Sequence, residues 1–175
     1  MSARENILAR IRQKSGRDGM TSEAELMLVR EHMARHERGP LPSMAMREPV
    51  QHFIDECARL KTTTAEVAAM VDVPAEVARY LAAHGLAPRC VGWHQFSTLD
   101  WAAAGMQFDD RIASGDDMVG LTDCFCAIGE TGTLLLLGAP GTPKATALLP
   151  ETHICVVSKA RIDATMEDAF DRMRR

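Results

Sequence analysis

Residues 120–137 constrain the fold of this chain more than any other stretch. They contain two short apolar runs, one on each side of the polar turn 129–133. Apolar runs of this length, bounded by glycines, are more typical of buried strands than of helices. Gly129 and Gly132 can take backbone angles closed to other residues, so the chain is able to turn sharply between the two runs.

The turn carries the first candidate site. Glu130 supplies a carboxylate, and Thr131 and Thr133 supply hydroxyls on either side of Gly132. Ligands of open α/β sheets tend to bind where strands end, so Glu130 is a candidate catalytic residue, as a general base or nucleophile. The two threonines and the backbone N–H groups near Gly132 are candidates for binding an anion. The alternative is a tight turn whose side chains only cap neighbouring backbone groups.

Two polar residues further along the chain are candidate ligand-binding residues. Lys144 follows the Gly/Pro-rich loop 138–143 and is able to meet a carboxylate or phosphate. His153 begins the apolar, β-branched run 153–157, a predicted strand, and its imidazole is expected to be exposed at the sheet edge. The alternatives are a solvated loop charge for Lys144 and a hydrogen bond to its own strand end for His153.

Hydrophobic periodicity and capping signals predict the remaining elements. Helices are expected over about residues 2–15, 22–36, 49–60, 72–85 and from 165 onward, and further strands over 61–67 and 89–92. Residues 93–119 give no clear pattern. Helices that alternate with strands predict an α/β fold, a parallel sheet flanked by helices.

A Pro/Gly-rich break near residue 40 divides the chain. Residues 1–45 are predicted to form an N-terminal helical extension and linker, and residues 46–175 the α/β domain. The first helix has a basic polar face, which is either a solvated surface or an arm that docks on a partner.

Composition excludes several classes of protein. The net charge of −4 offers no basic field for nucleic acid. No apolar run approaches the ~20 residues of a membrane span, and the charged N-terminus does not resemble a signal peptide. A cytoplasmic location is therefore expected.

Metal and cluster chemistry finds little support in the sequence. The five cysteines include no C-x-x-C pair, so free, core-like thiols are expected and no iron–sulfur cluster held by this chain alone. Cys124 and Cys126, two residues apart on a predicted strand, should share one buried face. The aspartate pairs 109–110 and 116–117 indicate either a hard-cation site or, without calcium-loop spacing, a solvated loop. His32 and His36 share a helix face but have no third ligand.

Several of these motifs together resemble the lactate-utilisation protein C (LUD domain) family. The resemblance rests on the segments 120–122, 128–134 and 148–157, which include the E-T-G-T and L-L-P-x-x-H-I patterns. The opening helix and the Leu-Asp-Trp segment 99–101 fit the same pattern. This sequence departs from the family at Gly129, where alanine is usual, and at Lys144, near which the family carries an arginine. The domain 46–175 is also expected to be shorter than the family at its C-terminus.

The resemblance implies a fold like that of the sugar-isomerase and CoA-transferase group. It also implies a non-redox subunit of an iron–sulfur system that oxidises L-lactate to pyruvate, with the clusters on partner subunits. The alternative is a stand-alone small-molecule enzyme or anion-binding module that uses Glu130.

Overall fold

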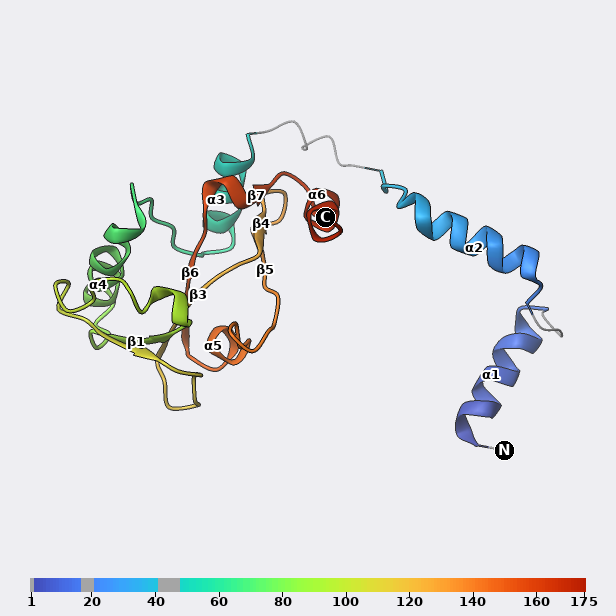
Figure 1. The fold of residues 1–175 in the computed structure, drawn as a ribbon, viewed down its shortest axis with the longest axis horizontal. Helices are drawn as coiled ribbons and strands as arrows, with labels where there is room; N and C mark the ends of the chain where they lie inside the picture. Colours follow the sequence, from blue (N-terminus) through green and yellow to red (C-terminus); the bar gives the residue numbers. More distant parts are fainter. Residues whose placement is uncertain (1, 17–20, 41–47) are drawn as a thin grey trace. The chain divides into compact units, whose positions relative to one another are not determined.

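The computed structural model describes residues 2–16, 21–40 and 48–175, and it divides the chain into two units, residues 1–41 and 42–175 (Figure 1). The predicted domain boundary at residue 45 lies outside the described residues. The first unit contains helices α1 (Ala3–Lys14) and α2 (Glu23–Arg35). Each begins with the predicted capping box, and neither helix contains a buried residue. The predicted N-terminal helical region is thus confirmed.

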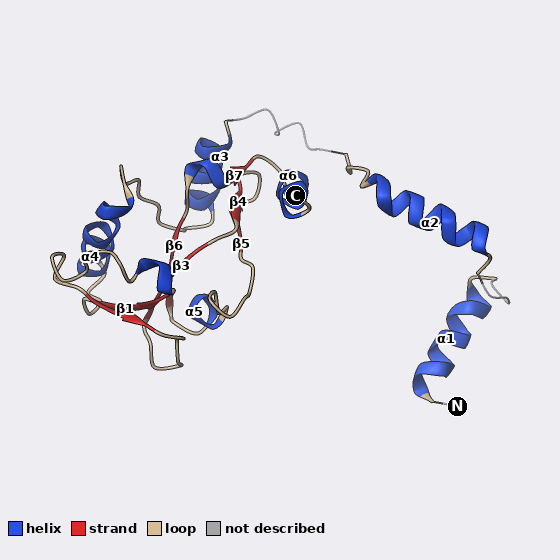
Figure 2. Ribbon diagram, in the orientation of Figure 1, coloured by secondary structure: helices blue, strands red, loops and turns tan. Residues whose placement is uncertain are grey.

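The second unit is an α/β domain (Figure 2). In chain order its elements are α3 (Pro49–Arg59), η2 (Met70–Asp72), α4 (Val73–Ala83), β1 (Arg89–Gly92), η3 (His94–Phe96), β2 (Gln107–Asp110), β3 (Val119–Asp123), β4 (Cys126–Ile128), β5 (Thr133–Leu135), α5 (Ala145–Leu148), β6 (Thr152–Val156), η4 (Lys159–Arg161), β7 (Ile162–Asp163) and α6 (Met166–Met173). No helix in the described ranges has the length and apolar character that a membrane crossing requires.

The main sheet has four parallel strands in the order β2-β1-β3-β6. Alternate side chains of β3 point to opposite faces of the sheet. Val119 and Leu121 pack in the same cluster as residues of α4, whereas a Cβ placed on Gly120 would meet the backbone of α5. Helices therefore cover both faces of β3, which confirms the predicted α/β class and its mainly parallel sheet.

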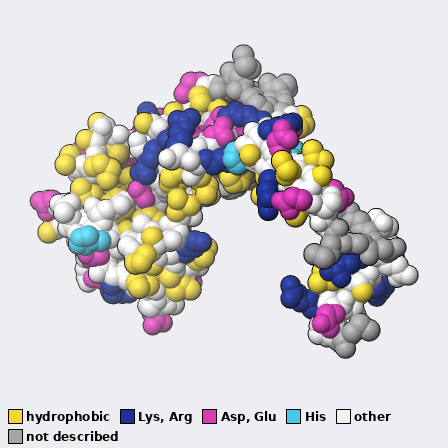
Figure 3. Space-filling model, turned by 45° about the vertical axis from the view of Figure 1, so that its right-hand side comes forward, with side chains coloured by type: hydrophobic (Ala, Val, Ile, Leu, Met, Phe, Trp, Pro, Cys, Tyr) yellow, Lys and Arg dark blue, Asp and Glu magenta, His cyan; other side chains and the backbone are white. Residues whose placement is uncertain are grey.

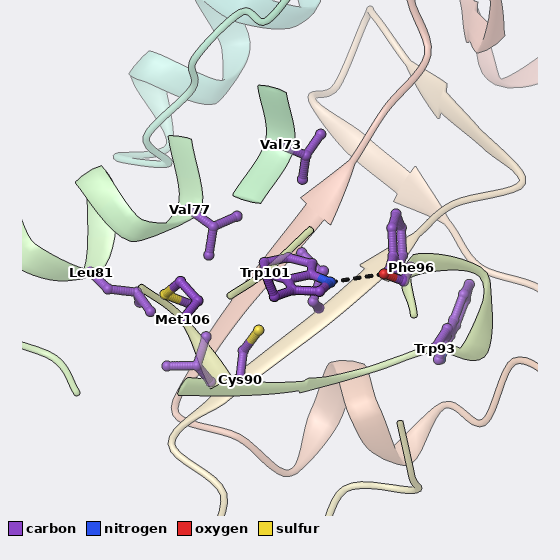
Figure 4. Packing of buried hydrophobic residues seen from close by; sticks show 10 residues of the cluster. Val73, Val77, Leu81, Cys90, Trp93, Phe96, Trp101 and Met106 are labelled. Carbon is purple, nitrogen blue, oxygen red and sulfur yellow. Dashed lines mark hydrogen bonds between the residues drawn. The ribbon is translucent and has the colours of Figure 1, made fainter. Parts of the chain in front are cut away.

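The largest core cluster lies between α4 and this sheet (Figure 4). Trp101 lies in it, and its indole N–H donates to the Phe96 carbonyl at 2.8 Å, so the buried ring leaves no unpaired donor. Its ring also stacks on Phe108 of β2 at 4.9 Å between centroids. The segment after β1, which gave no sequence pattern, is thus fixed by two buried aromatic contacts.

A second, three-stranded sheet has the order β5-β4-β7. Its central strand β4 lies between two helices, because Cys126 and Ile128 pack with Ala169 of α6 and Ala127 packs with α3. Cys124 also packs on the α3 side. The prediction that Cys124 and Cys126 share one face is therefore wrong. Strand β3 ends at residue 123 and β4 begins at 126, so the two thiols do not belong to one continuous strand.

One further strand prediction fails, and one strand was not predicted, for related reasons. Residues 62–67 have no regular structure, and all of them are exposed, because β-branched residues form a strand only when another strand pairs with them. Strand β2 was not predicted, since Asp109 and Asp110 give it a polar sequence. It forms through pairing with β1 at the edge of the sheet.

Replacement of Gly120 by alanine should destabilise the domain. The new Cβ would lie 2.1 Å from the Thr146 carbonyl oxygen, so α5 would have to move away from β3. We expect the free energy of unfolding to fall by about 1–3 kcal/mol or more, the usual cost of overpacking, as measured by urea denaturation. Gly141→Ala, where no atom lies within 4 Å of the new Cβ, is the matched control. Equal stability of the two variants would contradict the close packing of α5 on β3.

Candidate functional site around the Glu130 turn

The turn between β4 and β5 has the sharp backbone geometry that its glycines allow. Gly132 has a φ of 65°, in the left-handed region that favours glycine. Thr131 donates its hydroxyl hydrogen to the Thr133 hydroxyl at 2.8 Å. The E-T-G-T residues are thus brought together in one turn, with Thr133 exposed and Glu130, Thr131 and Gly132 partly buried.

The carboxylate of Glu130 is engaged with helix α6. Its Oε1 accepts from the backbone N–H of Met166, the first residue of the helix, at 3.0 Å. The Glu130 backbone N–H in turn donates to the Ala164 carbonyl at 3.1 Å. A helix N-terminus carries unpaired N–H groups and a partial positive charge, both of which favour a carboxylate there. The capping alternative for Glu130 therefore has direct geometric support.

The other side of the turn packs along α3. A Cβ on Gly129 would lie 2.9 Å from the Pro49 carbonyl oxygen, and a Cβ on Gly132 would lie 3.2 Å from Cβ of Glu56. These contacts place the turn over the α3 face that also carries His52, because residues three and four apart lie on one helix face. Alanine at position 129 would be crowded by that carbonyl.

His52 is a polar residue of this region that sequence reasoning missed. Its side chain is buried, its Nε2 has no hydrogen-bond partner, and that atom lies 4.0 Å from Glu56 Oε1. Glu56 also binds Arg59 at 2.7 Å. The available signal was the i, i+4 His–Glu pair beside the apolar stripe of α3. The apolar stripe alone accounts for the helix, so this pair does not stand out in the sequence.

Lys144 and His153 lie elsewhere. Lys144 precedes α5, its side chain lies over Gly138, and Figure 1 shows α5 beyond the opposite end of β5 from the turn. His153 does lie on the outermost strand β6, but its ring is half-buried rather than exposed as expected. The His153 Nε2 and the Thr122 hydroxyl are 2.8 Å apart, and burial lowers the pKa of His153. The structure therefore does not gather the predicted residues into a single site.

Most of the cysteine thiols lie in the core. Burial raises the pKa of Cys57, raises that of Cys90 to about 12 and raises that of Cys126 to about 11. Cys124 and Cys155 interact, and the hydrogen bond from Cys155 lowers the pKa of Cys124 while raising that of Cys155. Within the described ranges, no three His, Cys, Asp or Glu side chains converge as a metal-ligand set.

One aspartate of each pair, Asp109 or Asp117, forms an ion pair with an arginine that lines a surface depression. Asp117 accepts two hydrogen bonds from Arg111, at 2.6 and 2.8 Å, and one from the Ser114 backbone at 2.7 Å. Asp109 pairs with Arg89 at 2.9 Å. The depression, about 490 Å³, lies at the amino ends of β1 and β3 and is lined by both arginines. Asp117 thus lies in a turn that surface ion pairs stabilise.

The loss of stability on acidification should depend on Asp117. The Arg111 guanidinium, with help from Ser114, holds the pKa of Asp117 well below its usual range. A depressed folded-state pKa stabilises the protein above the unfolded pKa of about 4, and this stabilisation is lost as the pH falls through the folded-state value. Asp117→Asn should therefore be less stable than wild type at pH 7, and the difference should shrink below about pH 3.

Urea denaturation at a series of pH values measures this difference. Asp116→Asn, which removes a neighbouring exposed carboxylate, is the matched control and should retain the wild-type dependence. A pH-independent cost for Asp117→Asn would mean that its charge has no part in the network.

Comparison with known proteins identifies one part of the chain. Residues 93–175 match the family model described as LUD domain, which confirms the predicted resemblance for the segment that begins directly after β1. Neither the curated proteins nor the solved structures yielded a match. The matched segment includes the Glu130 turn, β6 and α6, whereas α3 with His52 lies before it. Residues 93–175, just under half of this chain, are therefore similar to a LUD domain.

Proposed function

We propose that this chain is a non-redox subunit of a cytoplasmic, iron–sulfur-dependent system that oxidises L-lactate, with the clusters held by partner subunits. The observation that carries the proposal is the LUD domain match over residues 93–175. The remaining support comes from the chemistry of the thiols and of the Glu130 turn.

The cysteines of this chain lack cluster-binding spacing, because the sequence contains no C-x-x-C pair. A cysteine ligates iron as the thiolate, yet the pKa values of Cys57, Cys90, Cys126 and Cys155 are all raised. Only Cys124 has a lowered pKa, and its partner there is another thiol. This distribution supports assigning the clusters to other subunits.

The Glu130 turn supports a structural or binding role better than redox chemistry. Its carboxylate already holds the first N–H of α6, and its two threonine hydroxyls bind each other. The turn thereby joins β4, α3 and α6 into one body, which a partner subunit could recognise as a fixed surface.

Purification from cells that grow on L-lactate tests the proposal. The tagged full-length chain should bring down other chains together with iron and acid-labile sulfide, and the iron should leave with those chains when the complex is dissociated. An untagged strain is the control. A chain that stays free of iron–sulfur partners during growth on lactate would overturn the proposal.

A second candidate function is a small-molecule enzyme or anion-binding module that uses Glu130. It is favoured by the buried, unpartnered His52 Nε2, which lies 4.0 Å from Glu56 Oε1 on the α3 face under the turn. The Glu56 carboxylate and the His52 imidazole, close to the turn, are suited to acid–base chemistry.

Glu130 variants separate the two candidates. If Glu130 only caps α6, Glu130→Ala should lower the free energy of unfolding by about 0.5–2 kcal/mol, as capping residues do, and Glu130→Gln should lower it less because its amide oxygen still accepts. Glu151→Ala, at an exposed turn, is the control. Loss of a small-molecule turnover in a stable Glu130→Gln variant would instead favour the enzyme.

A thermal-shift screen completes this test. Lactate, pyruvate, sugar phosphates and CoA compounds should leave the melting temperature unchanged if the accessory role is correct. A bound ligand at 100 times its dissociation constant would stabilise the wild type by about 2.7 kcal/mol, and loss of that shift in Glu130→Gln would place the ligand at the turn.

A further inference from the structure

Strands β3 and β6 bring two thiols together on one face of the main sheet. The strands pair in parallel, with Thr122 opposite Cys155, and Figure 1 shows them side by side. Cys124 comes one residue after the end of β3. In a core cluster beside α3, Cys124 is buried and Cys155 packs against it. Two cysteines that lie far apart in the sequence are therefore neighbours in the fold.

The stagger of side chains between the two strands explains this contact. The hydroxyl of Thr122 lies 2.8 Å from Nε2 of His153, although the register places His153 opposite Gly120. Side chains of β6 on this face therefore reach two residues forward along β3. The same step, moved two residues along both strands, joins Cys155 to Cys124, because side chains alternate between faces with a period of two. A hydrogen bond links the two thiols.

The hydrogen bond between the thiols favours a thiolate on Cys124. It is the main cause of the lowered pKa of Cys124; burial opposes it, and the guanidinium of Arg161 adds to it. Arg161 is held in place by an ion pair with Asp123 at 2.9 Å. The same hydrogen bond raises the pKa of Cys155, which therefore keeps its proton. Because the thiolate is the reactive form of cysteine, the pair combines a nucleophilic sulfur with a neighbouring thiol.

Access to the pair is graded. Cys124 is 1% exposed, whereas Cys155 is partly exposed on the outermost strand of the sheet. Figure 3, which colours cysteine with the apolar residues, shows side chains of this kind at the surface of the α/β domain. A small neutral oxidant such as hydrogen peroxide is suited to a site of this kind, whereas a bulky disulfide is not. The three remaining thiols are buried and have raised pKa values (Cys57, Cys90 and Cys126).

We propose that Cys124 and Cys155 form a redox-sensitive thiol pair, which a small peroxide oxidises to a disulfide within the folded chain. The bond ties the end of β3 to β6 and encloses residues 125–154, which include the Glu130 turn. The reaction modifies this chain and is not a step of lactate oxidation. It does not use the Glu130 carboxylate, so it is independent of the proposed function.

The oxidation proceeds in two steps. The Cys124 thiolate attacks one oxygen of hydrogen peroxide, the O–O bond breaks, and the hydroxide that leaves takes up the proton lost by Cys124, which gives water and a sulfenic acid. The Cys155 sulfur then attacks the Cys124 sulfur, the S–O bond breaks, and the departing hydroxide takes up the Cys155 proton. Two thiols are thus oxidised to one disulfide, and one peroxide is reduced to two waters.

Peptide mapping of the full chain tests the pair without any substitution. The reduced wild-type protein is treated with hydrogen peroxide under native conditions, remaining thiols are alkylated, and the digest is analysed by mass spectrometry. We expect a peptide pair that joins Cys124 to Cys155 with the loss of two hydrogens, and dithiothreitol should reverse it. A chain in which other thiols are oxidised first, or in which this link forms only after urea is added, would overturn the proposal.

Serine variants assign the role of each thiol. Cys155→Ser keeps a hydrogen-bond donor beside Cys124, so oxidation of Cys124 should stop at the sulfenic acid, which dimedone traps. Cys124→Ser should consume peroxide at least about tenfold more slowly, because it lacks the thiolate. Cys57→Ser, in the same cluster, is the matched control and should form the disulfide at the wild-type rate. Circular dichroism checks that each variant is folded. Unchanged peroxide consumption in Cys124→Ser, or loss of the disulfide in Cys57→Ser, would contradict these roles.

Urea denaturation tests whether the bond fits the folded sheet. The oxidised wild type should unfold at a higher urea concentration than the reduced protein, because a closed loop restricts the unfolded chain. Dithiothreitol should remove the difference, and Cys155→Ser treated with peroxide should not show it. A lower midpoint for the cross-linked chain would mean that the bond distorts the sheet, and the proposal that the two thiols meet in the native fold would fail.

Discussion

The domain depends on the close approach of α5 to the central strand β3. Gly120 has no side chain, so the Thr146 carbonyl can lie where a Cβ would otherwise be. The neighbouring residues Val119 and Leu121 fill the opposite face beneath α4. Strand β3 is thus covered on both faces while it pairs with β1 and β6. Helix α5 contacts both β3 and β6. Without its close approach to β3, β6 would lose this helix contact.

A second arrangement of the same kind surrounds β4. Alternate residues of this three-residue strand pack on α6 and on α3, which makes β4 the junction between helices from opposite ends of the domain. The turn that follows completes the junction: Glu130 holds the start of α6, and Gly132 allows close contact with α3. The E-T-G-T motif of this chain therefore has a structural role: it links β4 to helices α3 and α6.

The turn lies within the segment 93–175 that matches the LUD domain model. The core thiols have mostly raised pKa values, and the turn is fixed on three sides by backbone and packing contacts. Among the described residues near the turn, the buried His52 beside Glu56 is not explained by packing, because a buried ring nitrogen without a partner is costly.

The sequence by itself determined the features that depend on local chemistry. Capping boxes at Ser2 and Ser22 and the left-handed glycine at 132 formed as predicted, because neighbouring residues supply the whole cause. The predicted strand at His153 also formed, through pairing with β3. Only the tertiary structure decided which distant groups meet. Strand β2 forms despite its aspartates because β1 pairs with it, Glu130 caps a helix 36 residues away, and Lys144 lies apart from the turn. The local sequence pattern does not identify these distant partners, because their contacts form only when helices from other parts of the chain enclose β3 and β4.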